Sequence, residues 1–154
     1  MNFILRTAFI FLAFIMVQAC TMKPATPIVD DETIVDAYWM LLSLEGEKVP
    51  VPKDNRMAYI RLQERENDII GYTGCNKISG KYKLTEPALQ FSKLTSTKMS
   101  CPQIETENML LDALSRTTNF KKSGSILTLY TGSNAVATFR AGNPELDQPN
   151  NLRN

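Results

Sequence analysis

Three cysteines, Cys20, Cys75 and Cys101, offer the most distinctive side-chain chemistry in this 154-residue chain. A thiol can attack as a nucleophile, pair into a disulfide or, as a thiolate, bind a metal. The chain contains no histidine, which removes the commonest general base, the usual partner of a catalytic thiol and a common zinc ligand. We therefore expect no enzyme, no cofactor and no metal site. A thiol nucleophile at Cys75 or Cys101 is the enzymatic alternative that stays open.

Cys20 follows the pattern of an export signal. Arg6 precedes an apolar stretch over residues 8–17, and the small residue Ala19 comes directly before the cysteine. As a helix rising ~1.5 Å per residue, this stretch reaches only about half of a ~30 Å hydrocarbon core. The junction resembles the lipobox of bacterial lipoproteins, in which the cysteine is acylated and becomes the first residue. We expect a signal peptide over residues 1–19 and lipidation of Cys20; an ordinary secretory signal is the alternative.

The residues after Cys20 and the charge balance indicate where the mature protein lies. Thr21 stands where an inner-membrane retention signal would place Asp. The expected location is therefore the periplasmic face of the outer membrane of a Gram-negative bacterium, with the acyl chains in the bilayer. Removal of Arg6 with the signal leaves 16 of the 17 basic residues against 16 acidic ones. This neutral balance argues against a nucleic-acid partner.

Cys75 and Cys101 remain as two thiols in an oxidising compartment, where pairing is expected. Their spacing differs from that of a Cys-x-x-Cys redox motif. A bridge would close a loop of about 26 residues and stabilise the fold by about 3–4 kcal/mol on the chain-entropy model. A reactive redox pair and two free buried thiols remain as alternatives.

The rest of the chain predicts one domain between two irregular segments. Residues 20–36 contain Pro24, Pro27 and acidic side chains and read as a lipidated tether, whereas residues 142–154 read as a disordered tail. Between them, short alternating segments predict an antiparallel sheet. The expected strands lie at residues 38–44, 58–62, 68–73, 80–84, 88–91, 120–122, 126–130 and 136–140.

A single helix is predicted from Ser100 to about Arg116. Ser100 and Gln103 have the spacing of a capping box, and Pro102 would sit in the first turn. Glu105 and Glu107 would favour the helix dipole. The apolar positions 109–111, 113 and 114 give the helix a face for packing on the sheet.

Four motifs occur in an order that resembles the META domain, the family of the heat-inducible lipoprotein HslJ. They are Trp39-x-Leu41-x-x-Leu44, Gly74-Cys75-Asn76, Gly80-Lys81-Tyr82, and Ser96-Thr97-Lys98-Met99-Ser100-Cys101. One departure is Ser100, where family members often carry Ala. The resemblance covers residues 37–141 and implies an α+β fold, a mostly antiparallel β-sheet curled into a partial barrel with one packed α-helix. It also implies that Cys75 pairs with Cys101.

The resemblance further implies a non-enzymatic envelope lipoprotein that supports envelope integrity or tolerance of stress and drugs through binding. A lipid or an envelope protein would be the partner. The alternative is a lipid- or peptide-binding barrel that resembles the secretin-pilot lipoproteins. In that case Trp39, Tyr59, Phe91 and Phe139 would enclose a cavity, although such residues more often fill a core.

Two interpretations are open for the polar residues around the cysteine motifs. Asn76 can stabilise the loop after Cys75, and the Thr97 hydroxyl can satisfy backbone donors before the helix. Alternatively, Asn76, Tyr82, Thr97 and Lys98 line a shared polar site beside the disulfide.

Overall fold

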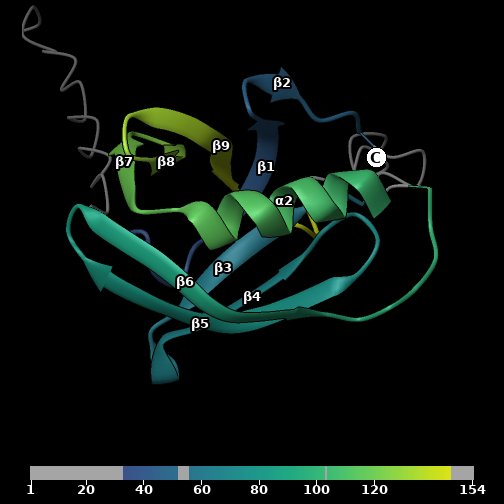
Figure 1. The fold of residues 1–154 in the computed structure, drawn as a ribbon, viewed down its shortest axis with the longest axis horizontal. Coiled ribbons are helices and arrows are strands. Elements are labelled where there is room, and N and C mark those ends of the chain that lie inside the picture. The colour runs from purple at the N-terminus through teal and green to yellow at the C-terminus, as the bar shows by residue number, and fades with distance from the viewer. Residues whose placement is uncertain (1–32, 52–55, 103, 147–154) are drawn as a thin grey trace, which may run out of the picture.

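The computed structural model describes residues 33–51, 56–102 and 104–146, so the predicted signal peptide, residues 1–19, and Cys20 lie outside the described residues. Within these residues one sheet curls into an antiparallel barrel in the strand order β2-β1-β3-β4-β5-β6-β7-β8-β9, closed by pairing of β1 with β9. Figure 1 shows the helix α2 lying across the barrel. The elements are β1 (Tyr38–Leu44), β2 (Glu47–Lys48), β3 (Tyr59–Gln63), η1 (Arg65–Asn67), β4 (Asp68–Tyr72), β5 (Lys77–Thr85), β6 (Ala88–Ser96), α2 (Ile104–Arg116), β7 (Asn119–Ser123), β8 (Ile126–Thr131) and β9 (Asn134–Gly142). The expected α+β fold is confirmed.

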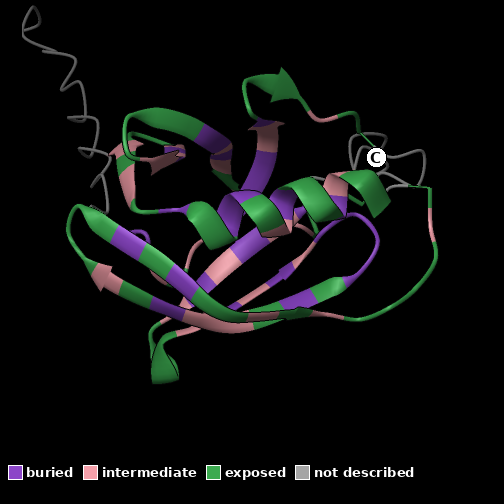
Figure 2. Cartoon of the chain, viewed as in Figure 1, coloured by how far each residue is buried: buried purple, intermediate pink, exposed green. Residues whose placement is uncertain are grey.

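The alternation of apolar and polar residues decides which face of each strand is buried. In β3, Ile60 and Leu62 point into the core. The alternate residues Tyr59, Arg61 and Gln63 are only partly buried and point outward. Figure 2 shows the same alternation of buried and exposed positions along β5 and β6, and a buried stripe along α2. That stripe contains Leu110, Ala113 and Leu114, which have the 3–4-residue spacing of one helix face.

The helix covers the weakest seam of the barrel. Strands β6 and β7 share only the pair Ala88–Asn119, whereas every other neighbouring pair of strands shares at least two positions. The helix packs against β6 and also contacts β1, β8 and β9. It therefore joins the two halves of the barrel where the hydrogen-bond ladder is shortest.

The folded domain begins earlier than the sequence suggested. Ile34 is fully buried, and its carbonyl oxygen accepts a 2.9 Å hydrogen bond from the Trp39 indole N–H. The Asp36 amide donates to the Leu62 carbonyl at 2.7 Å. Residues 33–36 thus belong to the domain, and the expected tether 20–36 was too long at this end.

The helix begins later than the sequence suggested. Its first residue is Ile104, and Ser100 and Pro102 precede it, so the capping-box prediction at Ser100 was wrong. The reason is tertiary: Cys101 is tied to Cys75 by a disulfide, and the Met99 backbone is hydrogen-bonded to the Asn76 side chain. These contacts fix Met99 and Cys101 against the turn after β4 and not in a first helical turn.

The C-terminal end of the domain also differs in detail from the expected tail. Gly142 is the last residue of β9, and residues 143–146 form a turn in which the Leu146 amide donates to the Asn143 carbonyl at 3.1 Å. The remainder of the expected disordered tail, residues 147–154, lies outside the described residues.

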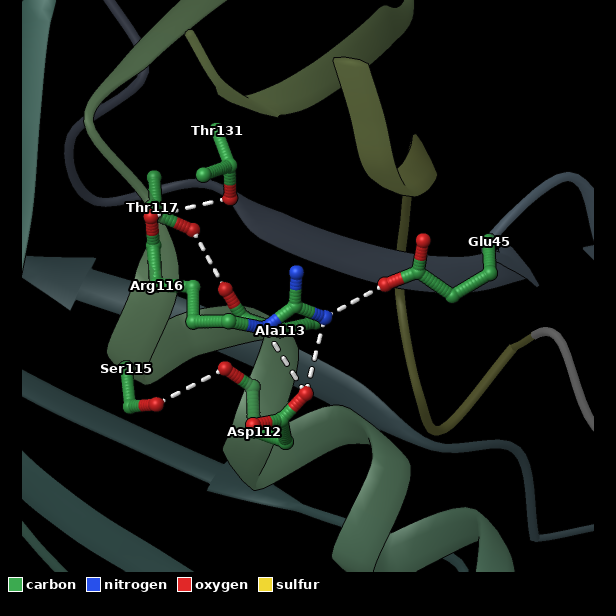
Figure 3. A network of polar contacts seen from close by, with 7 residues as sticks. All are labelled: Glu45, Asp112, Ala113, Ser115, Arg116, Thr117 and Thr131. Atoms are coloured by element: carbon green, nitrogen blue, oxygen red, sulfur yellow. Dashed lines mark hydrogen bonds and ion pairs between the residues drawn. The ribbon is translucent and has the colours of Figure 1, made fainter.

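A polar network holds the C-terminal end of α2 (Figure 3). The Arg116 guanidinium contacts Asp112 on the same helix at 2.8 Å and Glu45 in the β1–β2 turn at 2.6 Å. The Thr131 hydroxyl donates to the Arg116 carbonyl at 2.9 Å. The hydrogen bonds that the Arg116 guanidinium donates to Asp112 and Glu45 raise the pKa of Arg116 above its usual value. The network ties the helix end to both β1 and β8.

Candidate functional site

Cys75 and Cys101 form a disulfide with Cα atoms 6.1 Å apart, within the usual range for such bonds. The bridge connects the turn after β4 to the segment between β6 and α2. Gly74 has φ +91°, a left-handed conformation that glycine adopts without steric cost. The predicted pairing is confirmed, and the alternative of two free thiols was wrong.

Asn76 is the centre of a hydrogen-bond network beside the bridge. Its Oδ1 accepts 2.8 Å hydrogen bonds from the Thr97 hydroxyl and from the Met99 amide. Its Nδ2 donates to the Met99 carbonyl at 3.2 Å and to the Cys75 sulfur at 3.3 Å. The side chain is 1% exposed, so these contacts satisfy an amide that would otherwise be costly to bury. Asn76 therefore positions the segment that leads into α2.

A second pair, Thr73 and Glu107, extends this network into the helix. The Thr73 hydroxyl donates to Glu107 Oε2 at 2.8 Å and accepts a hydrogen bond from the backbone N–H of Asn76 at 2.9 Å. Both side chains are buried. The sequence interpretation placed Glu107 with the residues that favour the helix dipole and missed this contact. A signal was present: Glu107 precedes Leu110 by three residues and Leu114 by seven, which places it on the buried helix face.

The structure brings together only part of the predicted polar site. Asn76 and Thr97 are hydrogen-bonded to each other, and Lys98 follows them as an exposed side chain. Tyr82 lies elsewhere, with its hydroxyl donating to the Gln63 carbonyl at 3.1 Å beside the β3–β4 connection. Tyr82 does not belong to this cluster because it sits six residues along β5 from Asn76, near the other end of the strand.

The META domain family matches residues 32–143, from just before Ile34 to just after the end of β9. The chain belongs to the META domain family. No curated protein matches the sequence.

Solved structures resemble this META domain in fold. The NMR structure of a protein from Burkholderia xenovorans matches with a TM-score of 0.57 and 24% identity. The match covers 71% of this chain and 83% of the Burkholderia chain. A second NMR structure matches with a TM-score of 0.54 and 26% identity, covering 77% and 92%. A DUF4847 family protein from Bacteroides vulgatus matches with a TM-score of 0.52 and 12% identity, covering 71% and 94%. These likenesses support the barrel with one helix.

The interior of the META domain is filled by side chains. Trp39, Phe91 and Phe139 are buried within the hydrophobic core, whereas Tyr59 lies on the outer face of β3. A small apolar cavity beside Thr73 and Gly74 has a volume of about 20 Å³, which is room for about one water molecule. The four aromatic residues therefore do not surround a ligand cavity, contrary to what the binding-barrel alternative requires.

The disulfide and its hydrogen-bond network hold the turn after β4 against the segment before α2. Both sulfurs are bonded to each other, so neither is available as a thiolate nucleophile in this state. Among the described residues, no group of three or more acidic or cysteine side chains is arranged to hold a metal. In the same part of the chain, no helix has the length and apolarity needed to cross a membrane.

Proposed function

We propose that this META domain protein is an exported lipoprotein of the cell envelope that acts by binding and not by catalysis. The acyl chains on Cys20 would anchor it to the outer membrane, with the folded domain in the periplasm. There it would support envelope integrity or tolerance of stress and drugs. The observation that carries this proposal is the Cys75–Cys101 disulfide within the folded domain.

The disulfide supports export because such bonds persist in oxidising compartments and are rare in a reducing cytosol. It also agrees with the export-signal pattern that ends at Cys20. The folded domain begins near Ile34, so residues 20–32 would lie between the lipidated cysteine and the barrel.

The filled interior supports a binding role at the surface of the domain. Trp39, Phe91 and Phe139 occupy the space that an enclosed lipid tail or apolar peptide would need. The pilot-like binding barrel is therefore the less favoured function, and a partner would contact the outer faces of the strands or of α2.

Metabolic labelling with a fatty acid tests the anchor directly. The wild-type chain should incorporate the label at Cys20 and partition with membranes, whereas Cys20→Ser should remain unlabelled and unprocessed. Cys75→Ser serves as the matched control, because it removes a different cysteine and should keep the label. Recovery of a mature, unlabelled wild-type protein from the soluble periplasm would contradict the proposal.

The choice of membrane has its own test. Separation of inner and outer membranes should place the wild-type protein in the outer fraction. Thr21→Asp should move it to the inner fraction, since Asp after the lipidated cysteine acts as the retention signal. An inner-membrane wild-type protein that is nevertheless labelled would refute the outer location and leave the lipid anchor intact.

A further inference from the structure

Three tyrosines form a row on the outer face of the barrel. Tyr59 in β3 pairs in register with Tyr72 in β4, and both alternate with core residues, so they point away from the interior. Their ring centroids lie 6.4 Å apart. Tyr38 in β1 continues the row, with its ring centroid 5.4 Å from that of Tyr59 in an edge-to-face arrangement.

An arginine lies at each end of this row. The Arg61 guanidinium carbon is 5.1 Å from the Tyr38 ring centroid, and the Arg56 guanidinium carbon is 5.4 Å from that of Tyr72. These distances are typical of cation–π contacts. Arg61 also pairs with Asp36 at 3.3 Å. The tyrosine faces are thus held in place between two positive charges.

A hollow of about 490 Å³ adjoins the row on the outer face of β3–β6. Tyr59 and Ile70 contribute its less polar side. Ser79 and Thr95 lie opposite, with their hydroxyl oxygens 3.1 Å apart. Lys77 adds an exposed positive charge, and none of the described residues that line the hollow is acidic.

The register explains why these groups share one face. Tyr72 pairs with Lys77, and Ile70 pairs with Ser79, which in turn pairs with Thr95. Residues directly opposite in an antiparallel sheet have Cβ atoms about 5 Å apart. The strand register therefore places aromatic, hydroxyl and cationic groups side by side over a surface as wide as a sugar ring or two.

These groups match the chemistry of a charged carbohydrate. A sugar ring has apolar C–H faces that can stack on tyrosine, and hydroxyls that can pair with Ser79 and Thr95. The positive charge of Lys77 would favour a carboxylate on the ring.

We propose that the outer face of β3–β6 binds a carboxylate-bearing glycan, with Tyr59 as the stacking platform and Lys77 as the charge partner. A protein partner fits less well, because protein interfaces concentrate apolar contacts at their centre, whereas most of the described residues that line this hollow are polar and its large aliphatic side chains are Ile70 and Ile78, of which Ile78 is buried in the core. The inference rests on the proposed function for its location, since a periplasmic domain would meet envelope glycans. Its test does not depend on lipidation.

Titration of the full-length chain by amide NMR tests the proposal, in a detergent without a sugar headgroup. Trigalacturonate is the acidic probe, its methyl triester is the neutral probe of the same shape, and triglutamate is the peptide probe. Trigalacturonate should shift amide signals of β3–β6 saturably and bind more tightly than the triester. Absence of saturable shifts with trigalacturonate at millimolar concentration would overturn the proposal, as would equal binding of the triester or preferential binding of triglutamate.

Substitutions at Lys77 and Tyr59 test whether the probe binds in this hollow. Because the two positions are tested separately, one variant can still be measured if the other unfolds. Lys77→Gln changes an exposed side chain and should weaken trigalacturonate binding about three- to fivefold, the size expected for one exposed ion pair. Tyr59→Ser should weaken it about tenfold, whereas Tyr59→Phe keeps the ring and should bind nearly as well. Lys121→Gln, at an exposed position of β7, is the charge-matched control. Equal losses in Lys77→Gln and Lys121→Gln would show that only net charge matters and would overturn the assigned site.

Discussion

The Thr73 hydroxyl donates a 2.8 Å hydrogen bond to a carboxylate oxygen of Glu107, and the two side chains are 1% and 3% exposed. One residue belongs to the turn after β4 and the other to α2, so the contact fastens the helix to the barrel. A buried carboxylate deprived of its hydrogen-bond donor is costly. The pair therefore contributes to stability well beyond an exposed contact of the same length.

Loss of the Thr73 hydroxyl should destabilise the fold. Thr73→Val keeps the shape and removes the donor to Glu107, and we expect the free energy of unfolding to fall by about 2–3 kcal/mol. Thr73→Ser keeps the hydroxyl and should recover most of this loss. Urea unfolding followed by tryptophan fluorescence measures both, since Trp39 is the single tryptophan and lies in the core.

A double-mutant cycle separates the pair from its surroundings. In a Glu107→Leu background, Thr73→Val should cost at least 1 kcal/mol less than in the wild type, roughly the coupling expected of contacting residues. Equal costs in both backgrounds would mean that Thr73 stabilises the fold only through the hydrogen bonds that its hydroxyl accepts from the backbone N–H groups of Cys75 and Asn76.

The disulfide should stabilise the domain by restricting the unfolded chain. The bridge spans a sequence separation of 26, and its removal in a Cys75→Ala/Cys101→Ala variant should lower the free energy of unfolding by about 2–5 kcal/mol. Thermal melts of the wild type with and without reductant provide an independent measurement. The reductant should not alter the melting temperature of the double variant; identical wild-type melts in both conditions would contradict a stabilising bridge.

Asn76 should contribute more to the free energy of unfolding than Thr97 or Lys98. Asn76→Ala removes the partner of Thr97 and of both backbone groups of Met99, so we expect a loss of about 2–4 kcal/mol. Thr97→Val removes one of these contacts and should cost about 1 kcal/mol. Lys98→Ala, at an exposed position, should change stability by less than about 0.5 kcal/mol. Chemical denaturation of the three variants under the same oxidising conditions ranks them.

The features of the fold that were predicted correctly are those that leave a pattern in the neighbouring sequence. Alternation located β3 and β8 within one or two residues, because one face of each strand is buried and the side chains alternate strictly. The pairing of Cys75 with Cys101 followed from the expected compartment and from the family resemblance. Such features depend on neighbours in the sequence or on the cysteines themselves.

The features that were missed depend on tertiary contacts. The helix start moved to Ile104 because Asn76 and the disulfide hold the preceding segment, and a local capping pattern at Ser100 contains no trace of them. Tyr82 was grouped with Asn76 because both stand in motif segments. Where each points depends on strand register and on the length of β5, which extends from Lys77 to Thr85.

The stability of the folded domain should fall as the pH rises above about 10, the ordinary pKa of tyrosine. Burial, followed by the neighbouring tyrosines, raises the pKa of Tyr59; burial, followed by the charges of Asp36 and Glu64, raises that of Tyr82. The unfolded chain then releases these protons first and binds fewer than the folded chain, so the free energy of unfolding decreases with pH. Below this range both states keep the protons, and the stabilisation is fully present.

Tyrosine-to-phenylalanine variants assign this pH dependence. Tyr59→Phe should flatten the decline above pH 10 and leave the stability at neutral pH nearly unchanged. Tyr82→Phe should also flatten it, but it should lower the neutral-pH stability by about 1 kcal/mol because the hydroxyl donates to the Gln63 carbonyl. Some decline should remain in both variants, since the hydrogen bond to Asp68 raises the pKa of Lys81 and its ion pair is lost in the same range. Urea unfolding between pH 7 and 11 measures the slopes, and a variant slope equal to that of the wild type would remove that tyrosine from the explanation.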